Sequence, residues 1–318
     1  MIWLLNMEGY LNEKYMPLDV KADLENAEIP EYYTHVNMED FDGKFERNED
    51  PRYPFRKVQE PANFTFSFVA DTCGRNHPYV HDLLKFFKNS LKQLEDQYNK
   101  VKDKHPCKIR SQIVYLANYG DAKTIGETGM SDINTFDIDT ELRAPGNGYD
   151  KQCDNCIPIN LGMMKAIENI QACGKGTHII FLCTSKPMHG LNPECPLKNP
   201  KTFRQSKYEH LVKGSFDEEY DVICSAMVKE NIQVILLPIF DESAAYSYGD
   251  KLASYIDENI KIDHNPGSSY VKKEKILIEK DLHNKNFSSV ADSVQKLLDE
   301  YIVNEFRAFI QTISFDHH

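Results

Sequence analysis

The sequence predicts an α/β domain with a Rossmann-like, doubly wound and mostly parallel sheet that has helices on both faces. From about residue 61 onward, short apolar runs alternate with longer segments in which apolar residues recur every three or four positions. Neighbouring parallel strands need crossover connections, so this alternation is typical of a doubly wound sheet. The 318 residues are also enough to bury a sizeable core.

The elements follow one another in the order that this class requires. Apolar runs predict strands at Phe64–Ala70, Ile109–Leu116, His178–Cys183, Ile232–Ile239 and Lys275–Ile278, with an edge strand near Ile133–Ile138. Helical periodicity predicts helices at His81–Tyr98, Ile157–Ile170, Glu218–Glu230, Ala244–Ile256 and Val290–Phe306.

Residues 1–60 form a distinct compositional zone, which we expect to be an extended arm. They contain 14 acidic and 7 basic residues and so supply −7 of the chain's net charge of −12. Prolines punctuate the zone, and aromatic residues are scattered among the acids. A wholly solvated tail rarely carries so many aromatic residues, so we expect the arm to lie on a surface, either of its own domain or of a partner. The predicted division is an acidic, aromatic arm over 1–60 and an α/β domain over 61–318.

Charge and hydropathy exclude several classes of partner. A net charge of −12 disfavours nonspecific binding to nucleic acid. No apolar run approaches the length of a membrane span, and the opening MIWLLNM lacks the length and basic flank of a signal peptide. Cys183 and Cys224 lie in apolar periodic segments, where a free buried thiol is common. We therefore expect no membrane insertion and a reducing, cytoplasmic compartment.

Polar residues lie in three loops that adjoin predicted strands or helices. Ligands of doubly wound sheets bind beyond the carboxyl ends of the strands. The loops after Ala70, before the helix at Ile157 and after Cys183 are therefore the candidate site, and each contains polar side chains.

The stretch from Phe64 to Phe306 resembles the von Willebrand factor type A family. FSFVADTCGRN is similar to the family's first strand and metal loop, THIIFLCTSKPMHG to the strand whose end carries a ligand aspartate, and IQVILLPI to the strand after the next helix. The pair His189–Gly190 and the loop Cys153–Asn155 resemble the subgroup found beside alpha-kinase domains. The resemblance implies a Rossmann-like fold and a role in assembly and partner docking.

The resemblance also implies a metal-ion-dependent adhesion site, which is altered in this chain. The family binds Mg²⁺ or Mn²⁺ through carboxylates and hydroxyls from the three loops. Asp71 keeps the first ligand position, but Cys73 and Arg75 occupy the two hydroxyl positions of the first loop. Asp154 stands in the second loop, and Ser185 replaces the expected aspartate of the third. A thiol is a poor ligand for a hard cation and a guanidinium repels one, so Mg²⁺ binding is not expected.

Two hypotheses account for Arg75. In the first, its guanidinium takes the metal's place and pairs with Asp71 and Asp154, which keeps the loop ordered without an ion. In the second, it points to solvent as the first exposed residue of the helix. If the register shifts by one residue, Thr184 takes the position assigned to Ser185.

A second set of residues has the composition of a zinc site. Cys153 and Cys156 have the spacing of half a site, and His189 and Cys195 follow in the third loop, which together allow a Cys₃His tetrahedron for Zn²⁺. The alternative is that these cysteines are ordinary thiols, because a single CxxC pair is not specific.

The sequence predicts a non-catalytic protein-interaction or scaffold module with a protein partner or a multi-subunit complex. The three loops of the candidate site form what we call the rim of the sheet. The alternative is a thiol- or zinc-dependent enzyme that uses Cys73, or Cys153 and Cys156, at this rim. Cys73 stands where a helix N-terminus and Arg75 would stabilise a thiolate.

Overall fold

The computed structural model describes residues 62–72, 77–103, 106–117, 125–136, 156–191, 214–239, 242–260, 266–273 and 287–315. All of them belong to the part of the chain that runs from Pro61 to His318. The predicted arm over 1–60 and the predicted strand Lys275–Ile278 lie outside the described residues.

The described residues form one sheet of seven strands with the order β3-β2-β1-β5-β6-β7, in which β4 pairs separately with β2. The strands are β1 (Ala62–Asp71), β2 (Cys107–Leu116), β3 (Ile125–Glu127), β4 (Ser131–Asp132), β5 (Gly176–Thr184), β6 (Ile232–Pro238) and β7 (Val271–Lys273). Strands β2, β1, β5, β6 and β7 are parallel to one another, whereas β3 and β4 run antiparallel to β2.

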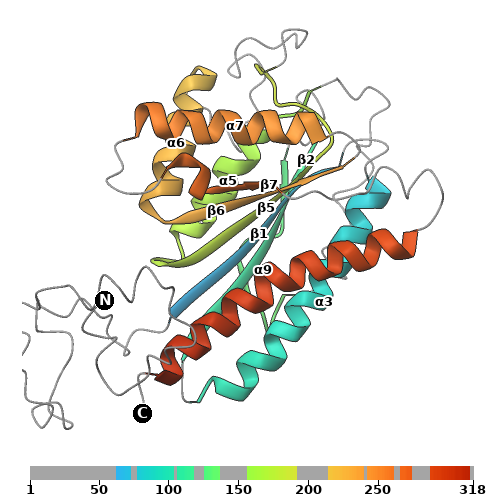
Figure 1. Ribbon diagram of the computed structural model, residues 1–318. Coiled ribbons are helices and arrows are strands. Elements are labelled where there is room, and N and C mark those ends of the chain that lie inside the picture. Colours follow the sequence, from blue (N-terminus) through green and yellow to red (C-terminus); the bar gives the residue numbers. More distant parts are fainter. Residues whose placement is uncertain are drawn as a thin grey trace, which may run out of the picture. The chain divides into compact units, whose positions relative to one another are not determined.

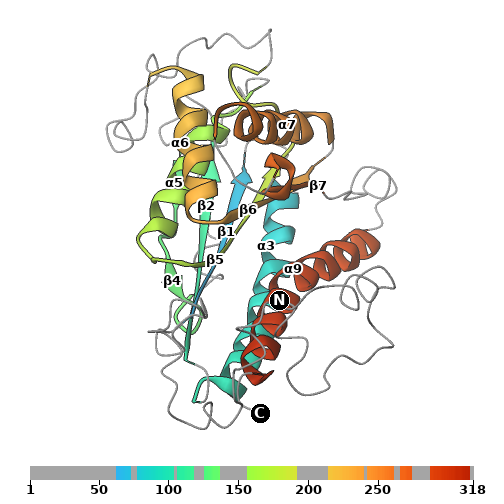
Figure 2. The same cartoon turned by 60° about the vertical axis from the view of Figure 1, so that its left-hand side comes forward.

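Helices cover both faces of the sheet (Figure 1). They are α3 (His77–Val101), α5 (Ile159–Gln171), α6 (Phe216–Lys229), α7 (Glu242–Asn259) and α9 (Phe287–Phe315), with a short 3-10 turn η7 (Gly267–Ser269) before β7. Figures 1 and 2 show the long helices α3 and α9 side by side on one face, and α5, α6 and α7 on the other. The predicted class, a mostly parallel α/β sheet flanked by helices, is confirmed.

Two cores result from the alternation of side chains along the strands. In β1, Phe64, Phe66 and Phe68 face α3 and α9, where Phe68 and Phe87 lie with ring centroids 5.4 Å apart. Val69 faces α5 and joins the core beneath α5, α6 and α7. A strand that is buried on both faces appears in the sequence as a continuous apolar run. For this reason the predicted bounds of β1, β5 and β6 are close to the observed ones.

The predicted edge strand near Ile133–Ile138 is wrong over the residues that the structure describes, 133–136. The chain pairs with β2 earlier, through β3 and β4, while residues 133–135 form a turn. Ile133 is buried, but as a single side chain in the core between the sheet and helices α3 and α9, and not as part of an alternating strand. Gly129, with φ of +75°, separates the two short strands, so neither is long enough to show a period in the sequence.

Candidate functional site

The carboxyl ends of four adjacent strands are joined by hydrogen bonds at one edge of the sheet. The backbone N–H and the hydroxyl of Thr72 both donate to the carbonyl oxygen of Leu116, at 2.9 and 2.8 Å, which ties the end of β1 to the end of β2. The N–H of Ile239 donates to the carbonyl oxygen of Thr184 at 2.9 Å, which ties the end of β6 to the end of β5. These bonds fix the starting points of the loops that the sequence indicated as a site.

Asp71 and Ser185 meet between the ends of β1 and β5. Ser185 Oγ donates a long hydrogen bond of 3.4 Å to Asp71 Oδ2. Asp71 is 0% exposed and Ser185 is 8% exposed. A buried carboxylate requires hydrogen-bond donors or a positive charge to offset its desolvation, so this oxygen pair marks a polar position in an otherwise apolar part of the sheet.

The charge of Asp71 also acts on the strand beside it. Burial raises the pKa of the Cys183 thiol well above its usual value, and the carboxylate of Asp71 raises it further. Cys183 is therefore a neutral thiol, and it is both free and buried as the sequence predicted, as is Cys224.

The loop after β5 is shaped by its own side chains. Thr184 Oγ1 accepts a hydrogen bond of 3.1 Å from the N–H of Lys186 and donates one of 2.9 Å to the carbonyl oxygen of the same residue. The Lys186 ammonium nitrogen is buried and forms no hydrogen bond with any described residue. The sequence reasoning missed Lys186, although a lysine directly after a buried strand, between Ser185 and Pro187, is a usable signal.

The second and third loops are also in contact. Ile157 forms a parallel bridge with Met188: its N–H donates to the carbonyl oxygen of Pro187 at 3.0 Å, and its carbonyl oxygen accepts from the N–H of His189 at 3.1 Å. Cys156 and His189 therefore lie on neighbouring backbone segments, and both are buried.

The remaining predicted site residues fall outside the described part of the chain. These are Cys73, Arg75 and Asp154 of the altered metal site, and Cys153 and Cys195 of the zinc set. Among the described residues, no group of three or more His, Cys, Asp or Glu side chains is placed to hold a metal ion.

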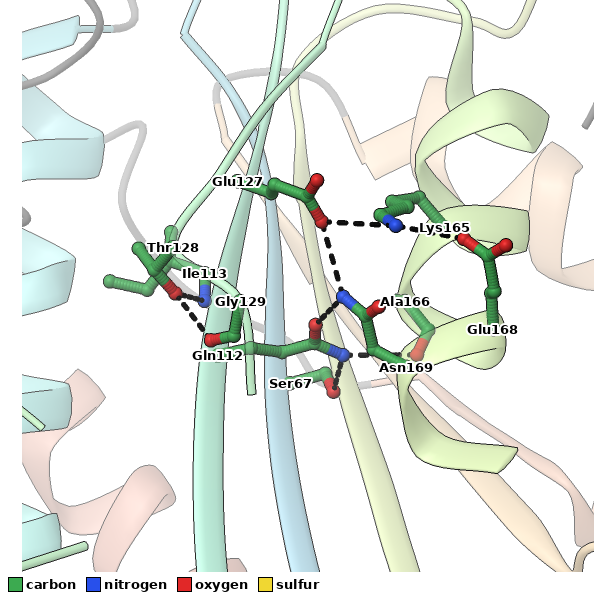
Figure 3. Close-up of polar contacts among 10 residues, drawn as sticks. All are labelled: Ser67, Gln112, Ile113, Glu127, Thr128, Gly129, Lys165, Ala166, Glu168 and Asn169. Carbon is green, nitrogen blue, oxygen red and sulfur yellow. Dashed lines mark hydrogen bonds and ion pairs between the residues drawn. The ribbon is translucent and has the colours of Figure 1, made fainter. Parts of the chain in front are cut away.

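A polar cluster attaches α5 to the sheet (Figure 3). Helix α5 begins directly after the second loop. Gln112 of β2 donates from Nε2 to Ser67 Oγ at 2.7 Å and to the carbonyl oxygen of Ala166 at 3.0 Å. Its Oε1 accepts from Asn169 Nδ2 at 2.7 Å. One amide side chain thus links β1, β2 and α5.

The cluster continues toward the edge of the sheet. Asn169 Nδ2 also donates to Glu127 Oε2 at 3.2 Å, and Lys165 Nζ lies 3.3 Å from the same oxygen and 2.8 Å from Glu168 Oε2. The position of α5, and with it the end of the second loop, is therefore set by polar contacts as well as by apolar packing. The sequence indicated only the apolar face of this helix.

The fold and this edge define a Rossmann-like α/β protein whose polar site lies where the parallel strands end. No family model matches the sequence, and no curated protein matches it. No helix in the described part of the chain is long and apolar enough to cross a membrane.

Several solved structures are distantly similar. The pilus adhesin SpaC of Lactobacillus rhamnosus GG, in its open conformation, is 10% identical with a TM-score of 0.43, over 80% of this chain and 31% of that one. Proximal thread matrix protein 1 from the mussel byssus, with a zinc-occupied MIDAS motif, is 14% identical with a TM-score of 0.36, over 76% and 48%. The human COPII-coat protein Sec24c is 13% identical with a TM-score of 0.40, over 86% and 38%. This chain thus spans less than half the length of each of them. Similarity this low carries no functional argument.

Proposed function

We propose that this chain is a non-catalytic interaction module with a von Willebrand factor type A-like domain whose metal-ion-dependent adhesion site is degenerate. The contact that carries the proposal is the hydrogen bond of 3.4 Å from Ser185 Oγ to Asp71 Oδ2 at the ends of β5 and β1. The resemblance assigns these two positions to the metal cage, and in this chain a hydroxyl stands where a second carboxylate is expected.

The chemistry of the rim disfavours a hard divalent cation. Replacing an aspartate by Ser185 removes one negative charge, and oxygen ligands that carry charge are what Mg²⁺ and Mn²⁺ need. Lys186, in the same loop as Ser185, is a basic residue and supplies no oxygen ligand. Cys73 and Arg75 in the first loop act in the same direction, because neither side chain supplies an oxygen.

A partner protein is then bound without a bridging metal. The acidic, aromatic segment 1–60 is the best candidate for a second contact surface, because aromatic side chains supply much of the binding energy at protein interfaces. In this proposal the rim and the segment 1–60 both contribute to one assembly.

The test is quantitative affinity purification from cells that express the tagged full chain. Four forms are compared: the wild type, a form lacking residues 1–60, Ser185→Arg at the rim, and Lys92→Glu on the exposed surface of α3. The proposal predicts one set of co-purifying proteins that is retained by Lys92→Glu and reduced at least tenfold by the other two changes. Equal recovery of the same proteins by all four forms would contradict it.

A structural zinc site is the second candidate for this end of the molecule. It is favoured by the bridge between Ile157 and Met188, which aligns the two backbone segments that carry Cys156 and His189. Elemental analysis of the purified chain decides the question. One zinc ion per chain in the wild type, and its loss in each of the variants Cys156→Ser and His189→Ala, would support the site. The absence of zinc from the wild type would contradict it.

A further inference from the structure

A buried chain of polar groups joins the three helices on one face of the sheet. Tyr248 of α7 donates from its hydroxyl to Asn160 Oδ1 of α5 at 2.9 Å. Asn160 Nδ2 donates in turn to Glu219 Oε2 of α6 at 3.1 Å. All three side chains are at most 1% exposed. Each helix thus contributes one member, and Asn160 connects the other two.

Glu219 is only partly satisfied in this chain. Its second oxygen, Oε1, is buried and has no hydrogen-bond partner among the described residues. An ionised carboxylate would leave this oxygen unsolvated, whereas a protonated carboxyl group carries no net charge and costs much less to bury. The geometry therefore favours the protonated form of Glu219.

The titratable groups around Glu219 provide no compensating positive charge. Tyr220 and Cys224 lie on α6 and Tyr248 on α7, and burial keeps all three in their neutral forms by raising their pKa values. Asp217 at the start of α6 is exposed and negative. Lys251 of α7 lies with Nζ over the Tyr220 ring, 5.5 Å from its centroid, and its ion pair is with Asp217, at 4.0 Å.

Helix α5, β6 and the loop after β5 also pack on α6, and the contacts that the structure describes there come from uncharged side chains. Helix α5 contributes Asn160, and β6 contributes the apolar Val234 and Leu236 to the shared core. The loop after β5 contributes Met188, whose Sδ accepts the Tyr220 hydroxyl at 3.2 Å. The same loop also carries a titratable group, the buried His189. Burial raises the pKa of Glu219 to about 7, and the hydrogen bond from Asn160 limits the rise.

We infer that Glu219 is a proton switch in the packing of α6 against α5 and α7, and that its ionisation loosens the first turns of α6 and the loop Met188–Gly190. The loop is coupled to α6 by two contacts. One is the hydrogen bond from Tyr220 to Met188, and the other is the close approach of Gly190 to the Phe216 ring. The inference concerns the fold of this face and does not rest on the proposed binding function.

The sign of the pH dependence follows from the direction of the shift. The pKa of Glu219 is about 7 in the folded chain, above its ordinary value of 4.5. Protonated Glu219 therefore contributes stability that is fully present below about pH 4.5 and is lost as the pH rises through 7. Between pH 5 and pH 8 this group should lower the folding equilibrium constant roughly 70-fold, because each pKa unit corresponds to a factor of ten.

The experiment is urea unfolding of the full chain between pH 5 and pH 8. Wild type is compared with Glu219→Gln, which is uncharged at every pH, and with Asp221→Asn, which removes a carboxylate from the exposed side of the same helix. The ratio of the folding constants of wild type and Glu219→Gln should fall roughly 70-fold across this range, whereas Asp221→Asn should follow the wild type. Parallel profiles for wild type and Glu219→Gln would overturn the inference.

A second measurement on the wild-type chain covers the case in which Glu219→Gln does not fold. The ¹³C resonance of the Glu219 carboxyl group should titrate with a midpoint near pH 7. Hydrogen exchange, corrected for its intrinsic pH dependence, should show the start of α6 and Met188–Gly190 losing protection over the same range. Titration of Glu219 together with the surface glutamates, near pH 4 to 5, would contradict the switch.

Discussion

Ser185 and Asp71 are 114 positions apart in the chain, yet their side chains meet across the ends of two adjacent parallel strands, with Oγ 3.4 Å from Oδ2. The meeting is a consequence of topology: β1 and β5 are neighbours in the sheet and run in the same direction, so residues at their carboxyl ends share one edge. A hydroxyl and a carboxylate at this position form a neutral-to-anionic hydrogen bond. A pair of carboxylates at the same position would repel each other without a cation.

Replacement of Gln112 by alanine should destabilise the chain by about 2 kcal/mol. The change removes the amide that satisfies Ser67, Ala166 and Asn169 and leaves buried polar groups without partners. Urea unfolding gives the free-energy difference. The matched control is Gln93→Ala on α3, where the amide is exposed and its bond to Asp299 is 3.4 Å long, so the cost should stay within about 0.5 kcal/mol. Equal costs for the two variants would show that the cluster in Figure 3 adds nothing to stability.

Gly190→Ala should cost more than Gly129→Ala. Both glycines have positive φ, of +89° and +75°, so both variants carry a conformational penalty of about 1 kcal/mol. A Cβ at Gly190 would also lie 2.4 Å from Phe216 Cδ2, whereas nothing lies within 4 Å of a Cβ at Gly129. The additional overlap should add about 1 to 3 kcal/mol, or else displace the loop from α6. Thermal unfolding of the two variants measures the difference, and a larger loss for Gly129→Ala would contradict the packing described here.

Thiol labelling separates the interaction module from the thiol enzyme. Burial raises the pKa of Cys183 well above its usual value and that of Cys107 to about 12, so neither side chain forms thiolate at neutral pH. Brief alkylation of the folded chain at pH 7.5, mapped by mass spectrometry, should leave both unmodified while the partly exposed Cys173 reacts. Full modification is expected after unfolding in urea. Labelling of Cys73 much faster than of a free cysteine analogue would instead favour the enzyme.

The sequence located the elements whose apolar signal is strong. The run that forms β6 was predicted to within one residue, because a central strand is buried on both faces and needs no tertiary information to be recognised. The helices were predicted at the right places. The prediction for α5 began two residues early, and those for the other four helices were too short. For example, the prediction for α9 ended at Phe306, whereas the helix continues to Phe315, and Phe309 and Ile310 still pack against the core.

The polar features were harder to predict, because the sequence does not show which face of an element is buried. Glu219 lies in the first turns of α6, where acidic residues usually interact favourably with the positive end of the helix dipole. Its spacing of four from Ile223 places it on the buried stripe, and this signal could have identified it. Gln112 was concealed in the same way within an apolar strand, since its partners come from β1 and α5.

The most direct test of the degenerate site is isothermal titration calorimetry of the full chain with Mg²⁺ and, separately, with Mn²⁺. The account predicts no heat beyond dilution for either ion, in wild type and in Asp71→Asn alike, because Ser185 supplies a hydroxyl where the resemblance expects a carboxylate. Stoichiometric binding of either ion with micromolar affinity, abolished by Asp71→Asn, would contradict it and would show that the adhesion site is intact.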